Sequence, residues 1–342
     1  MSSPASAEPA PAPETLETAM ARAAAVLSAA PAVALTCHVN PDPDAIGSML
    51  GLAGALRGRG ADVVCSWAND PMERPAWLDL VGDVAPIVEP AAFPSAPQVL
   101  VTLDAASLDR LGSLADRVGR SKEVVVIDHH VTNPGFGTIN VIDPHASSSA
   151  EVAFRLIRHL ELPLSDAAAA CLYAGVVTDT GRFQYQAATP ETLRVGADLR
   201  EYGFDHARLA QALFEDGSFA SLRVLARALE RVALVPDAGV GLVWTYITQE
   251  DLARAGASLA ETDDLIDVIR TAHEADVACV LKQQADGLFK VSLRSRGATD
   301  VGAIAESNGG GGHRLAAGYT SQRDVPGTVE AIVAALRAMP GG

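Results

Sequence analysis

Short apolar runs alternate with segments of helical length over the first half of the chain, and this alternation limits the folds open to it. Four runs are typical of buried strands because they are rich in Val, Ile and Leu: residues 31–37 (PAVALTC), 61–67 (ADVVCSW), 97–104 (PQVLVTLD) and 122–130 (KEVVVIDHH). Helical patterning occupies residues 14–30, 45–60, 151–161 and 166–180. The alternation predicts an α/β fold with a mostly parallel sheet and helices on both faces.

Helical patterning continues without a strand signal from about residue 189 to residue 232, which predicts a helical connector. Three further strand-like runs follow at residues 241–248, 276–284 and 287–296, with helical segments at 263–270 and 328–339. They predict a second, smaller α/β domain. We therefore expect a tail at residues 1–14, a first domain at 15–190, a connector at 191–232 and a second domain at 233–342.

The overall composition is that of a globular protein with an acidic surface. Hydrophobic residues make up 49% of the 342 residues, charged residues make up 20%, and the formal net charge is −16. Such a surface repels long nucleic acid, so we expect no binding of long duplexes. A small phosphate compound remains compatible with this charge wherever a local basic or metallic site receives it.

The N-terminus and the cysteines predict the compartment. Residues 1–14 (MSSPASAEPAPAPE) are rich in Pro and Ala and lack the cationic start and apolar core of a signal peptide, so they predict a disordered tail. No run of 18 apolar residues predicts a membrane span. Cys37, Cys65, Cys171 and Cys279 are scattered in apolar segments without a CxxC pair, which indicates buried free thiols. We expect a cytoplasmic protein without membrane contact.

Side chains with metal-binding chemistry follow the predicted strands of the first domain where each strand ends. The first strand is followed by His38, Asp42 and Asp44, the third by Asp104, the fourth by Asp128, His129 and His130, and the helix at 166–180 by Asp179. Because the carboxyl ends of parallel strands meet at one edge of a sheet, we expect these side chains to converge there.

Carboxylates gathered at one point repel each other unless cations neutralise them. Oxygen and imidazole donors without a thiolate favour Mn²⁺, with Mg²⁺ or Fe²⁺ as alternatives, over a structural zinc site. The number of donors is enough for two ions that share one carboxylate. Two such ions about 3.5–4 Å apart are typical of enzymes that transfer phosphoryl groups to water.

Each of these motifs, taken singly, also has an ordinary structural interpretation. Asp104 after a strand is commonly a helix cap, and the sequence HVNPDPD carries the signals of a turn. The two adjacent histidines are compatible with a solvated pair, and TDTG is compatible with a glycine-capped helix end. The four motifs together, in this order, favour the metal site.

The same motifs carry a family resemblance. HVNPDPDAIGS, VTLDAAS, VIDHH and GVVTDTGRFQY resemble the four motifs of the DHH phosphoesterases, and NGGGGHRLAAG, preceded by SLRSR, resembles the signature of the DHHA1 domain that accompanies them. The resemblance covers about residues 17–335. In length the chain is similar to the branch of oligoribonucleases (nanoRNases), pAp phosphatases and soluble cyclic-di-AMP phosphodiesterases.

The resemblance implies a role for each motif residue. One ion would be held by His38 and Asp42, the second by Asp44, His129 and Asp179, and Asp104 would be shared by both. Catalytic roles are implied for Asp128, which would orient a histidine ligand, and for His130, which would lie near the phosphate or the leaving oxygen. Pro43 stands where the family commonly has glycine, which would stiffen the loop without removing a ligand.

The second domain is expected to bind the substrate, which would place the active site in the cleft between the domains. Gly310, Gly311 and Gly312 offer a backbone that can approach a phosphate closely, although GGGG alone is also typical of a flexible linker. Arg294 and Arg296 alternate on one predicted strand and would point to the same face. The resemblance implies that Arg294 and His313 contact the nucleotide.

The resulting expectation is a two-metal phosphodiesterase that hydrolyses small adenine nucleotides to 5′-AMP. Its expected substrates are cyclic di-AMP, the linear dinucleotide pApA and very short oligoribonucleotides, with Mn²⁺ as cofactor and a homodimer as the expected assembly. The alternative is a pAp phosphatase or nanoRNase as the main role. A non-catalytic nucleotide sensor is less favoured because every ligand residue is present, and a DNA exonuclease is disfavoured by the −16 charge.

Overall fold

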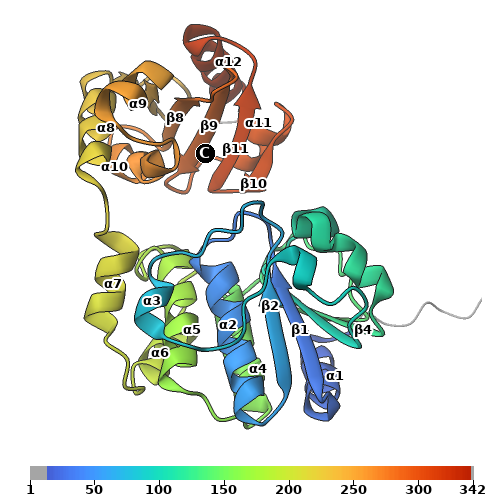
Figure 1. The fold of residues 1–342 in the computed structure, drawn as a ribbon. Helices are drawn as coiled ribbons and strands as arrows, with labels where there is room; N and C mark the ends of the chain where they lie inside the picture. The colour runs from blue at the N-terminus through green and yellow to red at the C-terminus, as the bar shows by residue number, and fades with distance from the viewer. Residues whose placement is uncertain (1–13, 340–342) are drawn as a thin grey trace, which may run out of the picture. The chain divides into compact units, whose positions relative to one another are not determined.

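The computed structural model describes residues 14–339, and they form two compact units (Figure 1). The first unit ends at Glu215 and the second begins at Asp216. The tail expected at residues 1–14 lies, except for Glu14, outside the described residues. Within residues 14–339, no helix combines the length and the apolar character needed to cross a bilayer.

The first unit is built on a parallel sheet of five strands in the order β2-β1-β3-β4-β5. The strands are β1 (Ala32–Cys37), β2 (Asp62–Ser66), β3 (Val99–Leu103), β4 (Glu123–Asp128) and β5 (Ile139–Ile142). Every pair of neighbours is parallel, which confirms the predicted topology. Strand β5 was not predicted from the sequence, because its four residues, INVI, are too short a run to stand out among the surrounding turn residues.

The register of the three central strands aligns their carboxyl ends. Cys37 pairs with Leu103, and Leu103 pairs with Ile127. The residues that come next in the chain are His38 after β1, Asp104 after β3, and Asp128, the last residue of β4. The sheet therefore brings three of the expected site residues to one row at one edge.

One face of this sheet is covered by α-helices and the other by 3₁₀ turns. The first face packs against α1 (Leu16–Ala29), α2 (Pro43–Gly58), α4 (Ser149–His159) and α5 (Asp166–Asp179). The opposite face packs against Phe93 and against Leu114 of η2 (Leu108–Arg120). An α-helix was expected on both faces, but η2 is interrupted by Gly112, whose φ of 54° is not helical.

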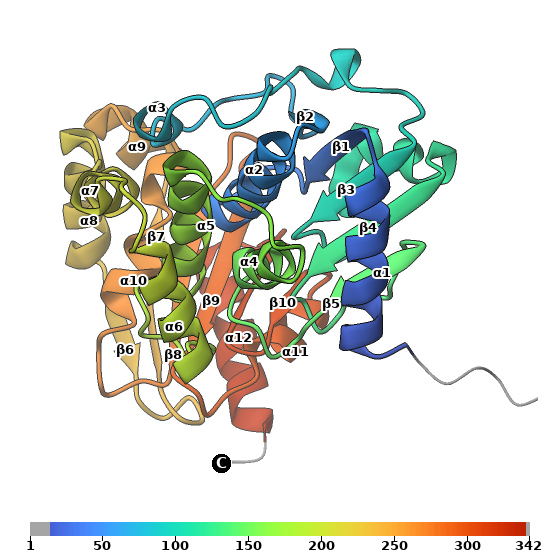
Figure 2. The ribbon, with the colours of Figure 1, turned by 90° about the horizontal axis from the view of Figure 1, so that it is seen from below.

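Helices α2 and α5 approach each other unusually closely, and α4 lies beside both (Figure 2). A Cβ atom at Gly47 would lie 2.2 Å from the carbonyl oxygen of Cys171, and one at Gly51 would lie 2.4 Å from the side chain of Leu172. Glycine is therefore required at these points of contact. The close approach brings Asp44, in the first turn of α2, towards Asp179, at the end of α5.

The second unit is a mixed sheet in the order β10-β11-β9-β8-β7-β6. Its strands are β6 (Ala233–Val235), β7 (Leu242–Ile247), β8 (Val277–Gln283), β9 (Phe289–Ser295), β10 (Gly311–His313) and β11 (Ala316–Ser321). Only the pair β7 and β8 is parallel among these described strands. Helices α11 (Val301–Glu306) and α12 (Val325–Ala338) cover one face, and α8 (Phe219–Glu230), α9 (Gln249–Ala255) and α10 (Leu265–Ile269) cover part of the other (Figure 1).

The helices expected to form a connector are divided between the two units. Helices α6 (Pro190–Leu199) and α7 (His206–Phe214) pack against α5 in the first unit, and α8 packs against β7 and α9 in the second. The short helix α3 (Leu78–Val81) also contacts α5. All four cysteines are buried free thiols, which confirms that prediction.

Candidate metal centre

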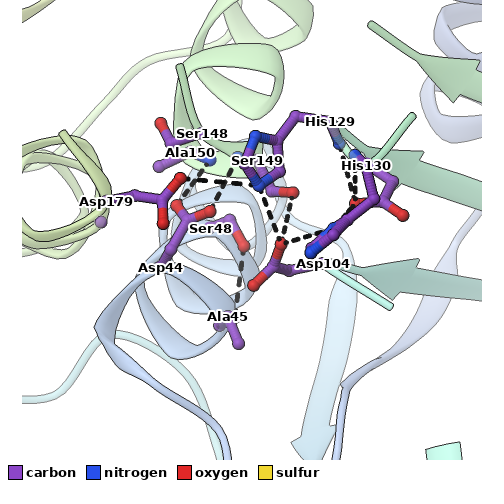
Figure 3. Close-up of polar contacts among 12 residues, drawn as sticks. Asp44, Ala45, Ser48, Asp104, His129, His130, Ser148, Ser149, Ala150 and Asp179 are labelled. Carbon is purple, nitrogen blue, oxygen red and sulfur yellow. Dashed lines mark hydrogen bonds and ion pairs between the residues drawn. The ribbon is translucent and has the colours of Figure 1, made fainter. Parts of the chain in front are cut away.

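The expected ligands meet at the carboxyl edge of the parallel sheet (Figure 3). Three overlapping groups each have ligand atoms within 4.8 Å of one another. They are His38, Asp42 and Asp104; Asp44, His129 and Asp179; and Asp104, Asp128, His129 and His130. The structure therefore brings together all eight residues that the sequence motifs singled out in the first domain.

In the first group, His38 is oriented by the main chain. Its Nδ1 lies 2.8 Å from the carbonyl oxygen of Val39, a contact that fixes the orientation of the ring. Nε2 lies 3.4 Å from Oδ2 of Asp104 and 3.9 Å from Oδ2 of Asp42. The imidazole therefore presents its ligating nitrogen to the two carboxylates.

Asp42 serves two purposes at once. Its Oδ1 accepts hydrogen bonds of 3.0 Å from the main-chain N–H groups of Asp44 and Ala45, so that Asp42 caps helix α2. Its Oδ2 faces His38. Asp42 can therefore have a structural role, as the cap of α2, and still present an oxygen to a metal ion.

In the second group, His129 stands between two carboxylates. Its Nε2 lies 3.5 Å from Oδ2 of Asp179 and 3.6 Å from Oδ1 of Asp104. Asp44 comes from the first turn of α2 and Asp179 is the last residue of α5. Three separate segments of the chain therefore supply the donors around Asp104, which itself comes from a fourth.

Asp104 joins the two groups. Its side chain is buried, Oδ2 faces His38, and Oδ1 faces His129. Its backbone has a φ of 55°, a left-handed conformation that costs a non-glycine residue on the order of 1 kcal/mol. The two oxygens of one carboxylate thus point to different donor groups, which is the arrangement that a shared ligand requires.

The charges of the cluster are poorly balanced by the protein alone. Burial, and then the negative charge of Asp104, raise the pKa of Asp42, Asp44 and Asp179 above their usual range. Although burial opposes it, contact with His38 and the charges of His129 and His130 lower the pKa of Asp104. The donors are carboxylate oxygens and imidazole nitrogens, so the residues present fit divalent cations that prefer such ligands.

Asp128 holds the side chain of His130. Its buried Oδ1 lies 2.7 Å from Nδ1 of His130 and accepts main-chain hydrogen bonds from His129 and His130. Its Oδ2 accepts a hydrogen bond of 2.5 Å from the side chain of Asn133. Although burial opposes it, the contact with Asp128 and the charge of Asp104 raise the pKa of His130 to about 9.

Several contact residues escaped the sequence analysis because their roles depend on tertiary structure. Asn133, Gly175 and Ser149 carry no local signal for such a role. Arg110 has a guanidinium nitrogen 3.2 Å from Nδ1 of His38, and its carbonyl oxygen accepts from Val39 N at 2.8 Å. The run ASSSAE, which contains the start of α4, is a signal that could have pointed to this region.

The expected substrate residues of the second unit lie on neighbouring strands. Ala316 of β11 pairs with Arg294 of β9 on one side and with His313 of β10 on the other. Because paired residues point to the same face of a sheet, Arg294 and His313 flank Ala316 on one face. Arg296 and Arg314 lie outside the strands and donate to the carbonyl oxygens of Ala272 and Gly297, respectively.

The glycine run forms an ordered hairpin. Gly311 and Gly312 belong to β10, so the linker alternative is wrong for this segment. A Cβ atom at Gly310 would lie 2.2 Å from the carbonyl oxygen of Gly318, and one at Gly312 would lie 2.6 Å from that of Ala316. Packing within the hairpin therefore accounts for these two glycines. A Cβ atom at Gly311 would meet no atom within 4 Å, so packing does not account for this glycine.

Comparisons with known proteins agree with this arrangement. The DHH family N-terminal domain matches residues 32–176, and the DHHA1 domain matches residues 240–339. The bifunctional oligoribonuclease and PAP phosphatase NrnA of Thermus thermophilus is 36% identical over 307 residues, which cover 89% of this chain and 88% of that protein.

Two further proteins are similar, one in the sequence of part of the chain and the other in the fold. The cyclic-di-AMP phosphodiesterase GdpP of Geobacillus thermodenitrificans is 29% identical over 199 residues, covering 57% of this chain and 29% of that protein. The crystal structure of an exopolyphosphatase-related protein from Bacteroides fragilis superposes with a TM-score of 0.85 at 24% identity, covering 94% and 96% of the two chains. This last likeness supports the fold.

Proposed function

The chain belongs to the family of DHH phosphoesterases that carry a DHHA1 domain, and from this premise we propose that it hydrolyses short oligoribonucleotides and pAp with the help of two divalent ions. For the oligoribonucleotides, pApA foremost, the products are 5′-mononucleotides, and for pAp the product is 5′-AMP. The observation that carries the proposal is Asp104, whose two carboxylate oxygens face two separate groups of donors.

The proposed ligands divide between two ions. His38 and Asp42 would hold one, Asp44, His129 and Asp179 the other, and Asp104 both; Mn²⁺ is the proposed ion because it accepts this mixture of oxygen and imidazole donors. When bound, such ions promote the attack of water on phosphorus and stabilise the negative charge that develops there. The protein contributes by holding the donors fixed before the substrate arrives.

His130 is proposed to contact the substrate. The contact of 2.7 Å between Nδ1 of His130 and Asp128 holds the ring in one orientation, and the proposed contact with a phosphate oxygen or with the leaving oxygen is through Nε2. Asn133 in turn holds Asp128 in place. Asp128 is therefore a positioning residue, and His130 is the member of the pair that would donate a hydrogen bond or a proton.

The second unit is proposed to bind the remainder of the nucleotide. Arg294 and His313 flank Ala316 on one face of the sheet, and the neighbouring β10 is an edge strand in which Gly312 is exposed. A guanidinium and an imidazole beside exposed main-chain groups are suited to a second phosphate. A substrate that reaches these residues would be bound more tightly than a minimal phosphodiester.

The choice of substrate follows the more similar relative. The NrnA protein, which is matched over most of both chains, is named for oligoribonuclease and PAP phosphatase activities. Cyclic di-AMP is the second candidate, because the cyclic-di-AMP phosphodiesterase GdpP is matched over a smaller part of its length. This order reverses the one that the sequence motifs alone favoured.

Product analysis tests the proposal. The protein is incubated with Mn²⁺ and with pApA, pAp, cyclic di-AMP or RNAs of two to five nucleotides, and the products are separated by chromatography. We expect AMP from pApA and pAp, and cyclic di-AMP to react more slowly through pApA. Absence of hydrolysis of all four substrates contradicts the proposal, and cyclic di-AMP as the fastest substrate would establish the second candidate instead. The homodimer stays a prediction, which light scattering tests.

A further inference from the structure

We propose that the first turn of α4 acts as a positioning element for two of the proposed metal ligands, and that Ser149 is its central residue. This inference rests on the proposed function. Helix α4 begins at Ser149, and its start lies against both Asp44 and Asp104 (Figure 3). These carboxylates come from α2 and from the end of β3, about 60 residues apart in sequence.

Asp44 is held by the main chain of α4. The N–H of Ser149 donates to Oδ2 of Asp44 at 2.8 Å, and the N–H of Ala150 donates to Oδ1 at 2.9 Å. The first N–H groups of a helix have no partner within the helix, and the helix start favours a negative charge. Both oxygens of Asp44, which is 1% exposed, are thereby fixed, and each keeps a second lone pair for another contact.

Asp104 is held by the hydroxyl of the same serine. Oγ of Ser149 lies 3.0 Å from Oδ1 of Asp104, and both side chains are buried. An ionised carboxylate can only accept, so the hydroxyl is the donor. The hydrogen bond opposes rotation of the carboxylate about its terminal bond, and it therefore keeps Oδ1 turned towards His129 and Oδ2 towards His38.

The side chain of Ser149 is not needed to cap α4, because the residue before it does so. Ser148 is the helix cap, because its Oγ accepts a hydrogen bond of 3.1 Å from the N–H of Glu151. Helix α5 confines Asp44 on another side, since a Cβ atom at Gly175 would lie 2.6 Å from Oδ1 of Asp44 and 2.7 Å from Cβ of Ala150. Ser148 thus caps the helix, and Ser149 positions the carboxylate of Asp104. The packing around Gly175 leaves Asp44 little room to move.

Residues that hold metal ligands typically change metal affinity by roughly 10- to 100-fold when they are substituted. Ser149→Ala removes the hydroxyl and keeps the main-chain N–H, so it should release Asp104 while Asp44 stays held. Ser48→Ala is a matched control, because Ser48 is equally buried and its hydroxyl donates at 3.2 Å to Ala45 of its own helix (Figure 3).

The test is calorimetric titration of Mn²⁺ into protein stripped with EDTA, which needs no catalytic turnover. We expect Ser149→Ala to bind Mn²⁺ roughly 10- to 100-fold more weakly than the unsubstituted protein, Ser48→Ala to bind it with unchanged affinity, and Ser149→Thr, which keeps a hydroxyl, to recover most of the loss. Ser149→Gly replaces the alanine variant if the latter does not fold.

Two results overturn the inference. One is unchanged Mn²⁺ affinity in Ser149→Ala, and the other is an equal loss in Ser48→Ala, which would assign the effect to general packing. Failure of the proposed function would be distinct, because then the unsubstituted protein itself would bind no divalent ion or would hydrolyse none of the nucleotides.

Discussion

Oδ1 of Asp128 lies 2.7 Å from Nδ1 of His130, and this contact joins a fully buried carboxylate to the more exposed of the two adjacent histidines. Asp128 accepts three further hydrogen bonds, from the main chain of His129 and His130 and from Asn133. A residue so fully engaged by the protein has little capacity left for an ion. We therefore propose that Asp128 supports His130 and is not a metal ligand.

Asp128→Asn should lower kcat without removing the bound ions. The amide keeps the size of the carboxylate but no longer favours a positively charged imidazole, so we expect a fall in kcat of roughly 10- to 100-fold on pApA, as for other supporting contacts. Steady-state kinetics and metal analysis of the same sample check it. Asp116→Asn, at a more exposed carboxylate paired with Arg120, is the control and should leave both unchanged. Loss of both ions in Asp128→Asn would make Asp128 a ligand instead.

Asp104→Ala should abolish turnover, because it removes the ligand that both donor groups share. We expect kcat to fall by on the order of 10³-fold or more and the Mn²⁺ content of the purified protein to fall with it. Asp104 has a strained backbone, so the fold should survive and the melting temperature without metal should not fall. Turnover near that of the unsubstituted protein would contradict the shared role, and outright unfolding would show that Asp104 is a structural residue.

Arg294→Ala should weaken binding more than it slows the chemical step. A charge-assisted contact between arginine and phosphate contributes roughly 1.5–3 kcal/mol, about 10- to 150-fold in affinity. KM for pApA should rise by this factor, whereas bis-p-nitrophenyl phosphate, which is too small to need a second binding site, should be cleaved nearly as before. Arg254→Ala, at an exposed arginine of α9 paired with Glu250, is the control. Equal losses on both substrates would place Arg294 in the chemical step.

The second unit should lose stability in acid through Asp251. Its carboxylate is buried and bonded to Arg231, with one contact of 2.8 Å, and this partner lowers the pKa of Asp251 below its usual value near 4. As the pH falls, Asp251 therefore becomes protonated in the unfolded chain before it does so in the folded chain. The pair stabilises the fold fully above about pH 4 and progressively less below it.

Asp251→Asn should remove roughly 1–3 kcal/mol at pH 7 and much less at pH 3. Melting temperatures between these two pH values measure the difference. Asp267→Asn, at an exposed carboxylate of α10, should reduce stability little at either pH. A destabilisation by Asp251→Asn that is the same at pH 7 and pH 3 would contradict the role of the ionised pair.

The sequence alone was enough to predict that the proposed ligands converge, because each lies at or just after the end of a strand, at the start of a helix or at the end of one. Parallel strands impose a common edge, so the positions of His38, Asp104 and Asp128 after three apolar runs predicted their convergence. The cap signal at Asp42 and the helix end at Asp179 are equally local. The glycine run, by contrast, suggested main-chain contact with phosphate at three residues, and two of them turn out to be required by packing.

The supporting contacts depend on long-range packing, which local patterns do not encode. Ser149 is separated in sequence by 45 residues from Asp104, which its hydroxyl contacts, and by 105 residues from Asp44, which its main-chain N–H contacts. In the sequence, Gly175 is one of several small residues of an apolar helix. Its role becomes apparent only from its contacts with Asp44 of α2 and Ala150 of α4. Strand β5 was not predicted for a different reason, because four residues carry too little periodicity to be distinguished from a loop.

The count of Mn²⁺ ions per chain, measured by native mass spectrometry while pApA hydrolysis is followed across the same titration, tests the central claim most directly. The two donor groups that share Asp104 predict two ions per chain, no hydrolysis after treatment with EDTA, and activity that rises as the second ion binds. Full hydrolysis of pApA by protein that retains no divalent ion would contradict the account.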